Sequence, residues 1–427
     1  MSASDPHLSY PASCDIHIAG RGLSAQVMAL ALSQTGYRLS MQQPRTADDR
    51  SKAVRDTRTT TIHQAGMQML SALGVWQNIT PSPSPITHIQ IAVGAQKDLA
   101  SSDWLLHFGS DNDDSPMAYT VSNQGLETAL LTALDKAPYV AFLSEEAAQQ
   151  HEADARLLIA CDGAASPLRK KAGLKVKDQQ AGQTALVALL RLNRPHHHTA
   201  LQRFLPAGPI ALMPLATQDA ALVWTLDDAG AQAMTNLSED ALAQAVDQAI
   251  GTLAFDSSES PKSLTPTLID TPKFWPLRPH YAYQLSHWRS DRQLMLLAGD
   301  AAHALHPLAG MGYNLALSDA AVLADCLTQQ ASLGLPAASP SLARQYGAGR
   351  RLEITALTAA TQILNRALST ELKSGRLNSA SKWLQPLFSA GMRGVQLSPL
   401  RTAFERLARG GQLAKANLLE GHWPKHS

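Results

Sequence analysis

A glycine-rich turn near the start of the chain constrains the fold more than any other feature. A strand-like run at 15–19 enters Gly20-Arg21-Gly22-Leu23-Ser24-Ala25, a helical pattern follows to Gly36, and 37–41 is typical of a second strand. In a dinucleotide-binding unit the first glycine permits the tight turn, the second lets the backbone approach a pyrophosphate, and Ala25 keeps the helix close to the sheet. The pattern predicts a dinucleotide site, with an ordinary strand-to-helix turn as the alternative.

The second strand lacks the acidic residue that binds the adenosine ribose in such units. It ends at Met41-Gln42-Gln43 instead. A glutamine still donates and accepts hydrogen bonds, but its contacts carry no charge. We therefore expect weaker binding of a dinucleotide than with Asp or Glu at this position.

Two later motifs place an acidic residue at the end of a strand-like run. Residues 157–160 lead to Asp162-Gly163 and a basic segment, and residues 294–297 lead to Gly299-Asp300. An acid at the C-terminal end of a strand suits a sugar or ribitol hydroxyl. Taken alone, the first motif is a turn and the second an ordinary connection.

A loop with a proline and two glycines follows Asp300. It contains His306-Pro307 and Gly310-Met311-Gly312-Tyr313-Asn314, and the pattern predicts a long helix from about 314 to 327. Glycines before a helix N-terminus let backbone N–H groups meet an electron-rich ring carbonyl. The loop is a further candidate for contact with a cofactor.

Composition excludes several classes of protein. The length of 427 residues predicts about three folded units, or two with a helical extension, and a content of 45% hydrophobic and 17% charged residues allows a sizeable core. A net charge of +1 gives no global attraction to nucleic acid. The three cysteines lie far apart and in no CxxC spacing, which argues against a disulfide framework, a zinc site or a redox pair.

The three elements between Gly20 and Asn314 resemble those of the group A flavoprotein monooxygenases, in which they form the FAD turn, the Asp-Gly motif and the Gly-Asp motif. The sequence is most similar to the UbiH-type hydroxylases of ubiquinone biosynthesis. Further stretches carry this closer resemblance, at 56–60 with 70–76, 119–126, 203–204 with 208–215, and 301–307. The resemblance implies an α/β fold like that of para-hydroxybenzoate hydroxylase, with a Rossmann-like FAD-binding domain, an antiparallel-sheet substrate domain and a helical C-terminal region.

The resemblance also implies which residues bind FAD. The glycine-rich turn would hold the pyrophosphate, Gln43 would meet the adenosine ribose, and Asp300 would hold the ribitol chain. Arg58 would lie near the pyrophosphate or the flavin. The full implied set is Gly20, Gly22, Leu23, Ser24, Ala25, Gln43, Arg58, Asp162, Gly163, Asp300, Pro307, Gly310, Met311, Gly312 and Asn314.

Two of the implied motifs serve the reaction itself. Asp162 and Gly163 would belong to the motif linked to both FAD and NAD(P)H. Pro307 would lie against the flavin, with residues 310–312 offering backbone N–H groups to its pyrimidine side. No side chain is nominated as a catalytic acid or base, and no metal site is expected.

Three residues depart from the family pattern. These are Gln43 in place of Glu, Arg21 in a usually small turn, and Met311 where Gln is common. The first two concern FAD affinity and the third concerns the surroundings of the flavin. Gln43 and Arg21 motivate an alternative from another class, a non-enzymatic scaffold of the same fold in a quinone-biosynthesis complex, with FAD weakly bound or lost.

Strand-like runs dominate the middle of the chain, at 184–192, 201–204, 210–215 and 220–226, and the turns between them predict antiparallel pairing. A helix capped by Ser238 and stopped by Gly251 interrupts them. A sheet with one face open beside the flavin would suit an apolar aromatic substrate. The expected organisation is an FAD-binding domain at 1–179 with an insertion about 86–110, a substrate domain at 180–285, the last FAD-binding part at 286–335 and a helical region at 336–427.

The activity implied by the resemblance is hydroxylation of an aromatic ring in a polyprenylated phenol of ubiquinone biosynthesis. NAD(P)H would reduce FAD, O₂ would form a flavin C4a-hydroperoxide, and one oxygen atom would pass to the ring. The cofactor supplies the difficult chemistry, while the protein orients the ring and excludes water. Hydroxylation of another aromatic compound is the alternative within the same class.

Two groups of histidines invite a metal interpretation. His196-His197-His198 follows a proline in a polar stretch, and a solvated loop is the expectation because the spacing defines no geometry. For His303 and His306 we expect packing or a flavin-side hydrogen bond rather than metal ligation.

The C-terminal region is strongly basic. Residues 341–427 contain thirteen Lys or Arg against four Asp or Glu, a net charge of +9. Its amphipathic stretches at 384–388 and 400–409 suit an anionic lipid surface or an acidic partner protein, and a helical cap with a solvated basic face is the equal alternative. No apolar run approaches the roughly 20 residues of a membrane span, and 1–13 lacks signal-peptide features. We expect a cytoplasmic protein, soluble or peripheral at the inner face of the membrane.

Overall fold

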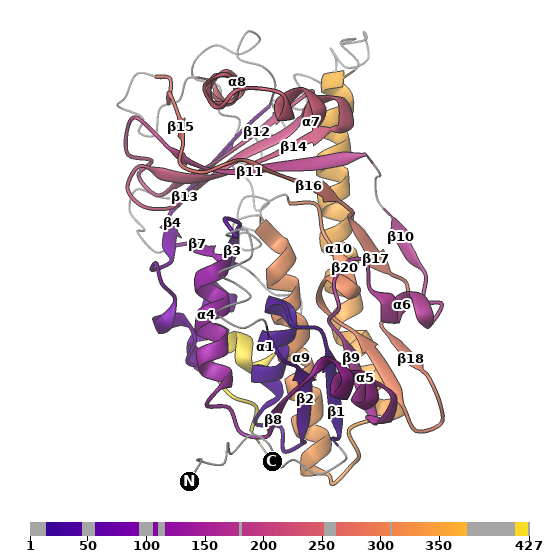
Figure 1. Cartoon of the computed structure of the whole chain (residues 1–427). Coiled ribbons are helices and arrows are strands. Elements are labelled where there is room, and N and C mark those ends of the chain that lie inside the picture. Colours follow the sequence, from indigo (N-terminus) through magenta and orange to yellow (C-terminus); the bar gives the residue numbers. More distant parts are fainter. Residues whose placement is uncertain are drawn as a thin grey trace.

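The computed structural model describes residues 14–44, 56–93, 106–109, 116–178, 182–251, 262–307, 310–373 and 415–425. Two large sheets form separate layers, with the second sheet above the first and a long helix beside both (Figure 1). The α/β fold class predicted from the sequence is confirmed.

The first sheet is built around the strand of the glycine-rich turn. Its order is β18-β19-β9-β1-β2-β8, and all neighbours are parallel except β18 and β19. Because β1, β9 and β19 are buried along their whole length, their near-continuous apolar sequences suit a central parallel position. The strands are β1 (Ile16–Ala19), β2 (Leu39–Gln42), β8 (Val140–Leu143), β9 (Leu157–Ala160), β18 (Ser286–Trp288) and β19 (Leu294–Leu297).

Helices cover this sheet on both faces. Helix α1 packs against both α4 and α9, and its residues from Ala25 to Leu32 are all buried, as expected for a helix that is apolar on every side. Helix α1 ends at Leu32, earlier than the predicted stop at Gly36, although Gly36 does adopt a left-handed φ of 88°. The helices are α1 (Leu23–Leu32), α4 (Asn123–Leu134), α5 (Glu145–Asp154), α6 (Pro167–Lys171) and α9 (Met311–Ser332).

The second sheet follows the order β15-β11-β14-β13-β12-β5-β6, and β16 also pairs with β11. The antiparallel pairing predicted for the middle of the chain is confirmed, while β5 and β12 form a parallel pair. The strands are β5 (His88–Val93), β6 (Leu106–Phe108), β11 (Gln183–Arg191), β12 (Thr199–Leu205), β13 (Gly208–Pro214), β14 (Asp219–Asp227), β15 (Thr267–Leu268) and β16 (Lys273–Leu277).

Helices α7 (Asp228–Thr235) and α8 (Glu239–Ile250) cover the face of this sheet that points away from the first sheet (Figure 1). As predicted, Ser238 caps α8 by accepting a hydrogen bond from the Ala241 N–H, and Gly251 ends it. Buried side chains such as Leu222, Trp224 and Val246 form the core between sheet and helices.

Smaller elements join the two layers. One three-stranded sheet contains β3 (Thr59–His63), β7 (Ala118–Ser122) and β4 (Ser84–Ile86), and another contains β10 (Val176–Asp178), β17 (His280–Ala282) and β20 (His303–Ala304). Helix α3 (Gln64–Ala72) follows β3 directly. Short 3-10 helices lie at η1 (Trp76–Asn78), η3 (Gly299–Ala301) and η5 (Asn417–Glu420).

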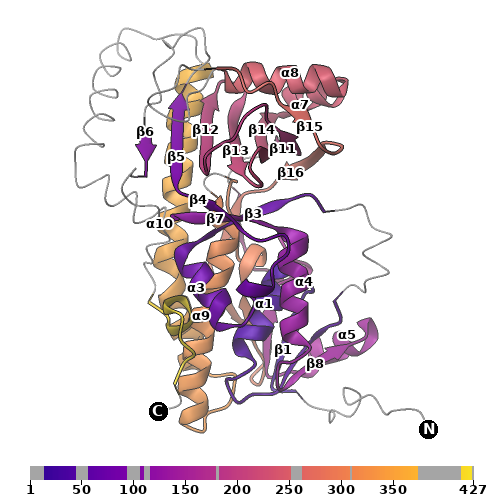
Figure 2. The ribbon, with the colours of Figure 1, turned by 90° about the vertical axis from the view of Figure 1, so that its left-hand side faces the viewer.

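The C-terminal helix α10 (Pro340–Lys373) runs beside both layers and contacts α9 and β12 (Figures 1 and 2). The segment 415–425 returns to the first layer, where η5 packs on α3 and the Trp423 indole N–H donates to the Ala72 carbonyl at 3.2 Å. The predicted amphipathic stretches at 384–388 and 400–409 lie outside the described residues. Within the described part of the chain, no helix is long and apolar enough to span a membrane.

The histidine run is not a fully solvated loop. His196 is 3% exposed, its ring Nε2 lies 2.8 Å from the Ala216 carbonyl oxygen, and burial lowers its pKa. The prediction of a solvated loop is therefore wrong at this residue, because the turn that precedes β12 folds back against the turn before β14.

Helix α9 begins at Met311 and ends at Ser332, and so extends beyond the predicted range at both ends.

Candidate functional site

The acidic and glycine motifs meet at one edge of the first sheet. Gly20, Gln43 and the 161–163 segment follow β1, β2 and β9, which are neighbours in the sheet, and Asp300 follows β19 beside β9. Carboxyl ends of parallel strands share an edge, which is where open α/β sheets bind ligands. Sequence positions that lie up to 280 residues apart therefore share one edge, from residue 20 to residue 300.

The glycine-rich turn leaves the N-terminus of α1 open. Gly20 has a φ of 135°, and a side chain there would lie 2.3 Å from the Cys161 carbonyl oxygen, so only glycine fits. Gly22 is exposed, and a Cβ atom there would meet nothing within 4 Å. Helix α1 has neither a side-chain cap nor an acidic residue in its first turn. Its free N–H groups and positive end can therefore receive an anion such as a pyrophosphate.

The Gly299-Asp300 turn lies directly beside this helix end. Gly299 has a φ of 56°, and a Cβ atom there would lie 2.9 Å from the Ser24 side chain. The Asp300 carboxylate is exposed, yet burial among surrounding protein atoms raises its pKa, an effect that His303, His280 and Arg58 partly offset. Asp300 is thus reachable from outside while its side chain lies among protein atoms. Its carboxylate can therefore accept hydrogen bonds from the hydroxyl groups of a ligand.

A second open helix end lies at the start of α9. Its N-cap, Gly310, has a φ of 62°, and a Cβ atom there would lie 2.4 Å from Thr61. Gly312 resembles Gly22 in having nothing within 4 Å of a Cβ position, and α9 also lacks a side-chain cap. The Tyr313 hydroxyl lies 3.4 Å from the Leu23 carbonyl oxygen, which brings the first turns of α9 and α1 together.

The side chains of two predicted site residues face protein. Asn314 donates from its amide to the Thr61 and Gly310 carbonyls and accepts from the His63 N–H, so it braces the start of α9 against β3. Met311 is 8% exposed and packs with Leu315 and Leu357. Of the others, Pro307 is half-buried, Gln43 is exposed, and Ala25 is fully buried behind the turn.

Arg58 connects the two layers near Asp300. Its guanidinium group pairs with Asp56 at 2.8 Å and lies 4.6 Å from the centre of the Trp275 ring of β16. Hydrogen bonding to Asp56 raises the pKa of Arg58, and the charges of Asp300 and Glu127 add to this effect. Arg58 is exposed, and a cationic group at this place is available to an anionic or electron-rich ligand.

The Asp-Gly motif is tied to the Gly-Asp turn by Arg169. The Asp162 carboxylate accepts from the Leu168 N–H at 3.1 Å and so supports the start of α6. Arg169 is 5% exposed and donates to the Ala164 carbonyl at 2.7 Å and to the Ala301 carbonyl at 2.6 Å. One buried guanidinium group thus joins both signature loops. The sequence pattern indicates only a basic segment here, because residue types do not reveal whether Arg169 is buried.

These features fit FAD. Two uncapped helix N-termini lie together, Gly22 and Gly312 leave room where a larger residue would place a side chain, and Asp300 offers a carboxylate to hydroxyl groups. A protein-family model described as an FAD binding domain matches residues 13–361. The chain belongs to this FAD-binding family.

Similar proteins are known among curated sequences and solved structures. The chain is 29% identical over 420 residues to ubiquinone hydroxylase UbiL of Rhodospirillum rubrum, covering 93% of this chain and 89% of that protein. It is 27% identical over 356 residues to the 3-demethoxyubiquinol 3-hydroxylase of Escherichia coli, covering 78% and 84% of the two chains. The p-nitrophenol 4-monooxygenase PnpA of Pseudomonas putida has the same fold, with a TM-score of 0.63, 17% identity, and coverage of 93% and 98%.

Proposed function

We propose that this protein is an FAD-dependent monooxygenase that hydroxylates the aromatic ring of a polyprenylated phenol in ubiquinone biosynthesis, with NAD(P)H as the electron donor. The observation that carries the proposal is the meeting of Asp300 with the open N-termini of α1 and α9 at one sheet edge. The names of the two curated relatives support the quinone pathway.

The chain's residues have separate tasks in this proposal. Residues 20–25 hold the pyrophosphate of FAD, Gln43 meets its adenosine ribose, Asp300 holds its ribitol hydroxyls, and the start of α9 holds the pyrimidine side of the ring. When bound, FAD supplies the electron transfer and oxygen chemistry. The protein's part is to orient the substrate and to keep water from the reacting atoms.

The second sheet offers a suitable surface for the ring and its apolar tail. Residues alternate along its strands, so Ala185, Val187, Ala211, Ala221 and Val223 point away from α7 and α8 and toward the first layer. On the same face of the sheet, Met213 packs against Ile86 and Ala118, which lie between the layers. Four of these five side chains are buried and Val223 is half-buried. The face is therefore lined by small apolar groups, and this character supports an apolar aromatic substrate.

Trp275 lies on this same face, because it pairs with Ala185 in the β11–β16 register. Trp275 is 41% exposed, and the guanidinium group of Arg58, just before β3, lies over its ring. The pair therefore stands between the proposed flavin position and the apolar sheet face. An indole with a guanidinium group beside it suits the side wall of a site for an electron-rich phenol.

The basic C-terminal region is the proposed contact with a membrane surface or a partner protein. A net charge of +9 over residues 341–427 supports contact with an anionic lipid surface or with an acidic partner in a quinone-biosynthesis complex. Sedimentation with anionic vesicles at low and high salt tests the lipid contact, and a protein that stays in solution at low salt contradicts it.

The function is tested on the purified full-length protein. We expect flavin absorbance, oxidation of NADH or NADPH that a short-chain prenylated phenol stimulates, and a product that carries one atom from isotopically labelled O₂. A phenol with the same ring but no prenyl tail serves as the matched substrate control. A colourless protein that also fails to bind added FAD contradicts the proposal and favours the scaffold alternative.

A further inference from the structure

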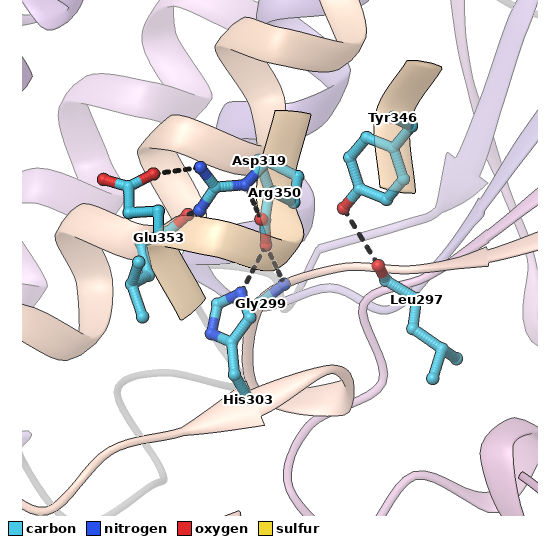
Figure 3. Close-up of polar contacts among 8 residues, drawn as sticks. Leu297, Gly299, His303, Asp319, Tyr346, Arg350 and Glu353 are labelled. Atoms are coloured by element: carbon cyan, nitrogen blue, oxygen red, sulfur yellow. Dashed lines mark hydrogen bonds and ion pairs between the residues drawn. The ribbon is translucent and has the colours of Figure 1, made fainter. Parts of the chain in front are cut away.

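A buried polar cluster lies behind the Gly299-Asp300 turn, centred on Asp319 of α9 (Figure 3). One oxygen of its carboxylate accepts from the Gly299 N–H at 2.7 Å and from His303 Nε2 at 2.8 Å. The other oxygen accepts from Arg350 Nε at 2.6 Å. Arg350 belongs to α10 and also pairs with Glu353. Neither the sequence motifs nor the proposed function accounts for this cluster.

The carboxylate of Asp319 is ionised although it is completely buried. Burial alone would raise its pKa, but the neighbouring His303 and Arg350, together with hydrogen bonds from His303 and Gly299, lower it below its ordinary value. The bond to the Gly299 N–H is therefore charge-assisted, and such bonds are about twice as strong as neutral ones.

This bond acts on the residue that immediately precedes Asp300. Gly299 is held on its other side by the Ser24 side chain, which occupies the space that a Cβ atom would need. The Gly299 carbonyl accepts from the Ala302 N–H at 2.9 Å, and Arg169 holds the Ala301 carbonyl. Asp319 thus supplies the contact that fixes the left-handed turn at its start, where the backbone direction of Asp300 is decided.

We propose that Asp319 is a positioning residue for the cofactor: it holds the Gly299-Asp300 turn in the conformation that aims Asp300 at the ribitol hydroxyls, with its charge maintained by Arg350 from the C-terminal helix. The inference rests on the proposed FAD site. It assigns α10 a part in cofactor binding without any contact between α10 and FAD.

The variant Asp319→Asn tests this role because it keeps the shape and removes the charge. An amide has one accepting oxygen and one donating NH₂ group, so at least one of the three donors around residue 319 meets another donor. We expect the Kd for FAD to rise about tenfold or more, since the contact of Asp300 with the ribitol is misdirected. The Kd for ADP should change less than twofold, because ADP contacts the glycine-rich turn and not Asp300.

Tyr346→Phe is the matched control. Tyr346 is equally buried, lies on α10 one turn before Arg350, and its hydroxyl donates to the Leu297 carbonyl at 2.9 Å, just before the turn (Figure 3). This variant should lower the melting temperature of the apo-protein but leave the Kd for FAD within about twofold. A merely structural Asp319 would behave in the same way as Tyr346, with FAD and ADP affected alike.

Hydrogen exchange of the wild-type apo-protein gives a second readout that needs no variant. The Gly299 amide should exchange slowly without FAD, because the turn is already held by Asp319. Fast exchange of this amide, or an Asp319→Asn protein that binds FAD as tightly as the wild type, overturns the positioning role. A wild-type protein that binds neither FAD nor ADP instead overturns the proposed function itself.

Discussion

Replacing Asp300 by alanine should remove FAD from the protein and leave the apo fold intact. The carboxylate accepts no hydrogen bond from the residues that the structure describes, and burial raises its pKa. A raised pKa means that the folded apo-protein disfavours the ionised form. The carboxylate therefore opposes folding as the pH rises above its ordinary pKa of 3.8, and at neutral pH its removal relieves this effect.

The loss of FAD affinity follows from the contact that Asp300 is proposed to make. A hydrogen bond from a hydroxyl to a carboxylate is worth about 1.5–3 kcal/mol. Its loss raises the Kd for FAD by about ten- to a hundredfold. Asp300→Asn keeps the shape and one accepting oxygen without the charge, so we expect its Kd to lie between those of the wild type and Asp300→Ala.

The measurement combines two quantities on each protein. Bound flavin per chain, or titration of the apo-protein with FAD, reports the affinity, and the melting temperature of the apo-protein at pH 7 reports the fold. An Asp300→Ala protein that retains full FAD refutes the assignment of the ribitol contact. An apo form that melts well below the wild type refutes the claim that Asp300 serves the ligand and not the fold.

Three further predictions concern cofactor affinity and pH. Gln43→Glu should lower the Kd for FAD severalfold, since it provides a charged acceptor for the ribose hydroxyls. A titration of the apo-protein that gives an unchanged Kd would mean that residue 43 does not face the ribose. Gly312→Ala should stabilise the apo-protein by about 0.5–1 kcal/mol, because alanine has the higher helix propensity. The same variant should weaken FAD binding, because the new methyl group enters the space at the N-terminus of α9. The melting temperature of the apo-protein should therefore rise while the affinity for FAD falls. Burial lowers the pKa of His306 to about 4, so the folded protein disfavours the protonated ring. The free energy of unfolding should therefore fall as the pH drops from 6.5 toward 4, by about 1.4 kcal/mol per pH unit for this group. The melting temperature of His306→Asn should depend less on pH over this range, and an equal dependence would contradict the prediction.

The acidic residues at strand ends illustrate what could be predicted locally. Asp162 and Asp300 each follow a short apolar run, and such a run next to glycine predicts a strand that ends at a sheet edge. Their roles nevertheless differ in the structure, since the Asp162 carboxylate accepts a hydrogen bond at the start of α6, while Asp300 is exposed. Which strand-end carboxylate is available to a ligand depends on what packs around it, and no local pattern contains that information.

The sequence by itself determined the strand–turn–helix unit at Gly20 and the capped helix α8, because each depends on backbone geometry and periodicity within a few residues. Only the tertiary structure decided that Arg350 and His303 meet at Asp319, that Arg169 joins two loops, and that Arg58 covers Trp275. These contacts join residues that lie far apart along the chain. The residue type of a charged side chain does not reveal whether it is solvated or buried. Only the fold determines whether a partner is present to compensate for the loss of hydration.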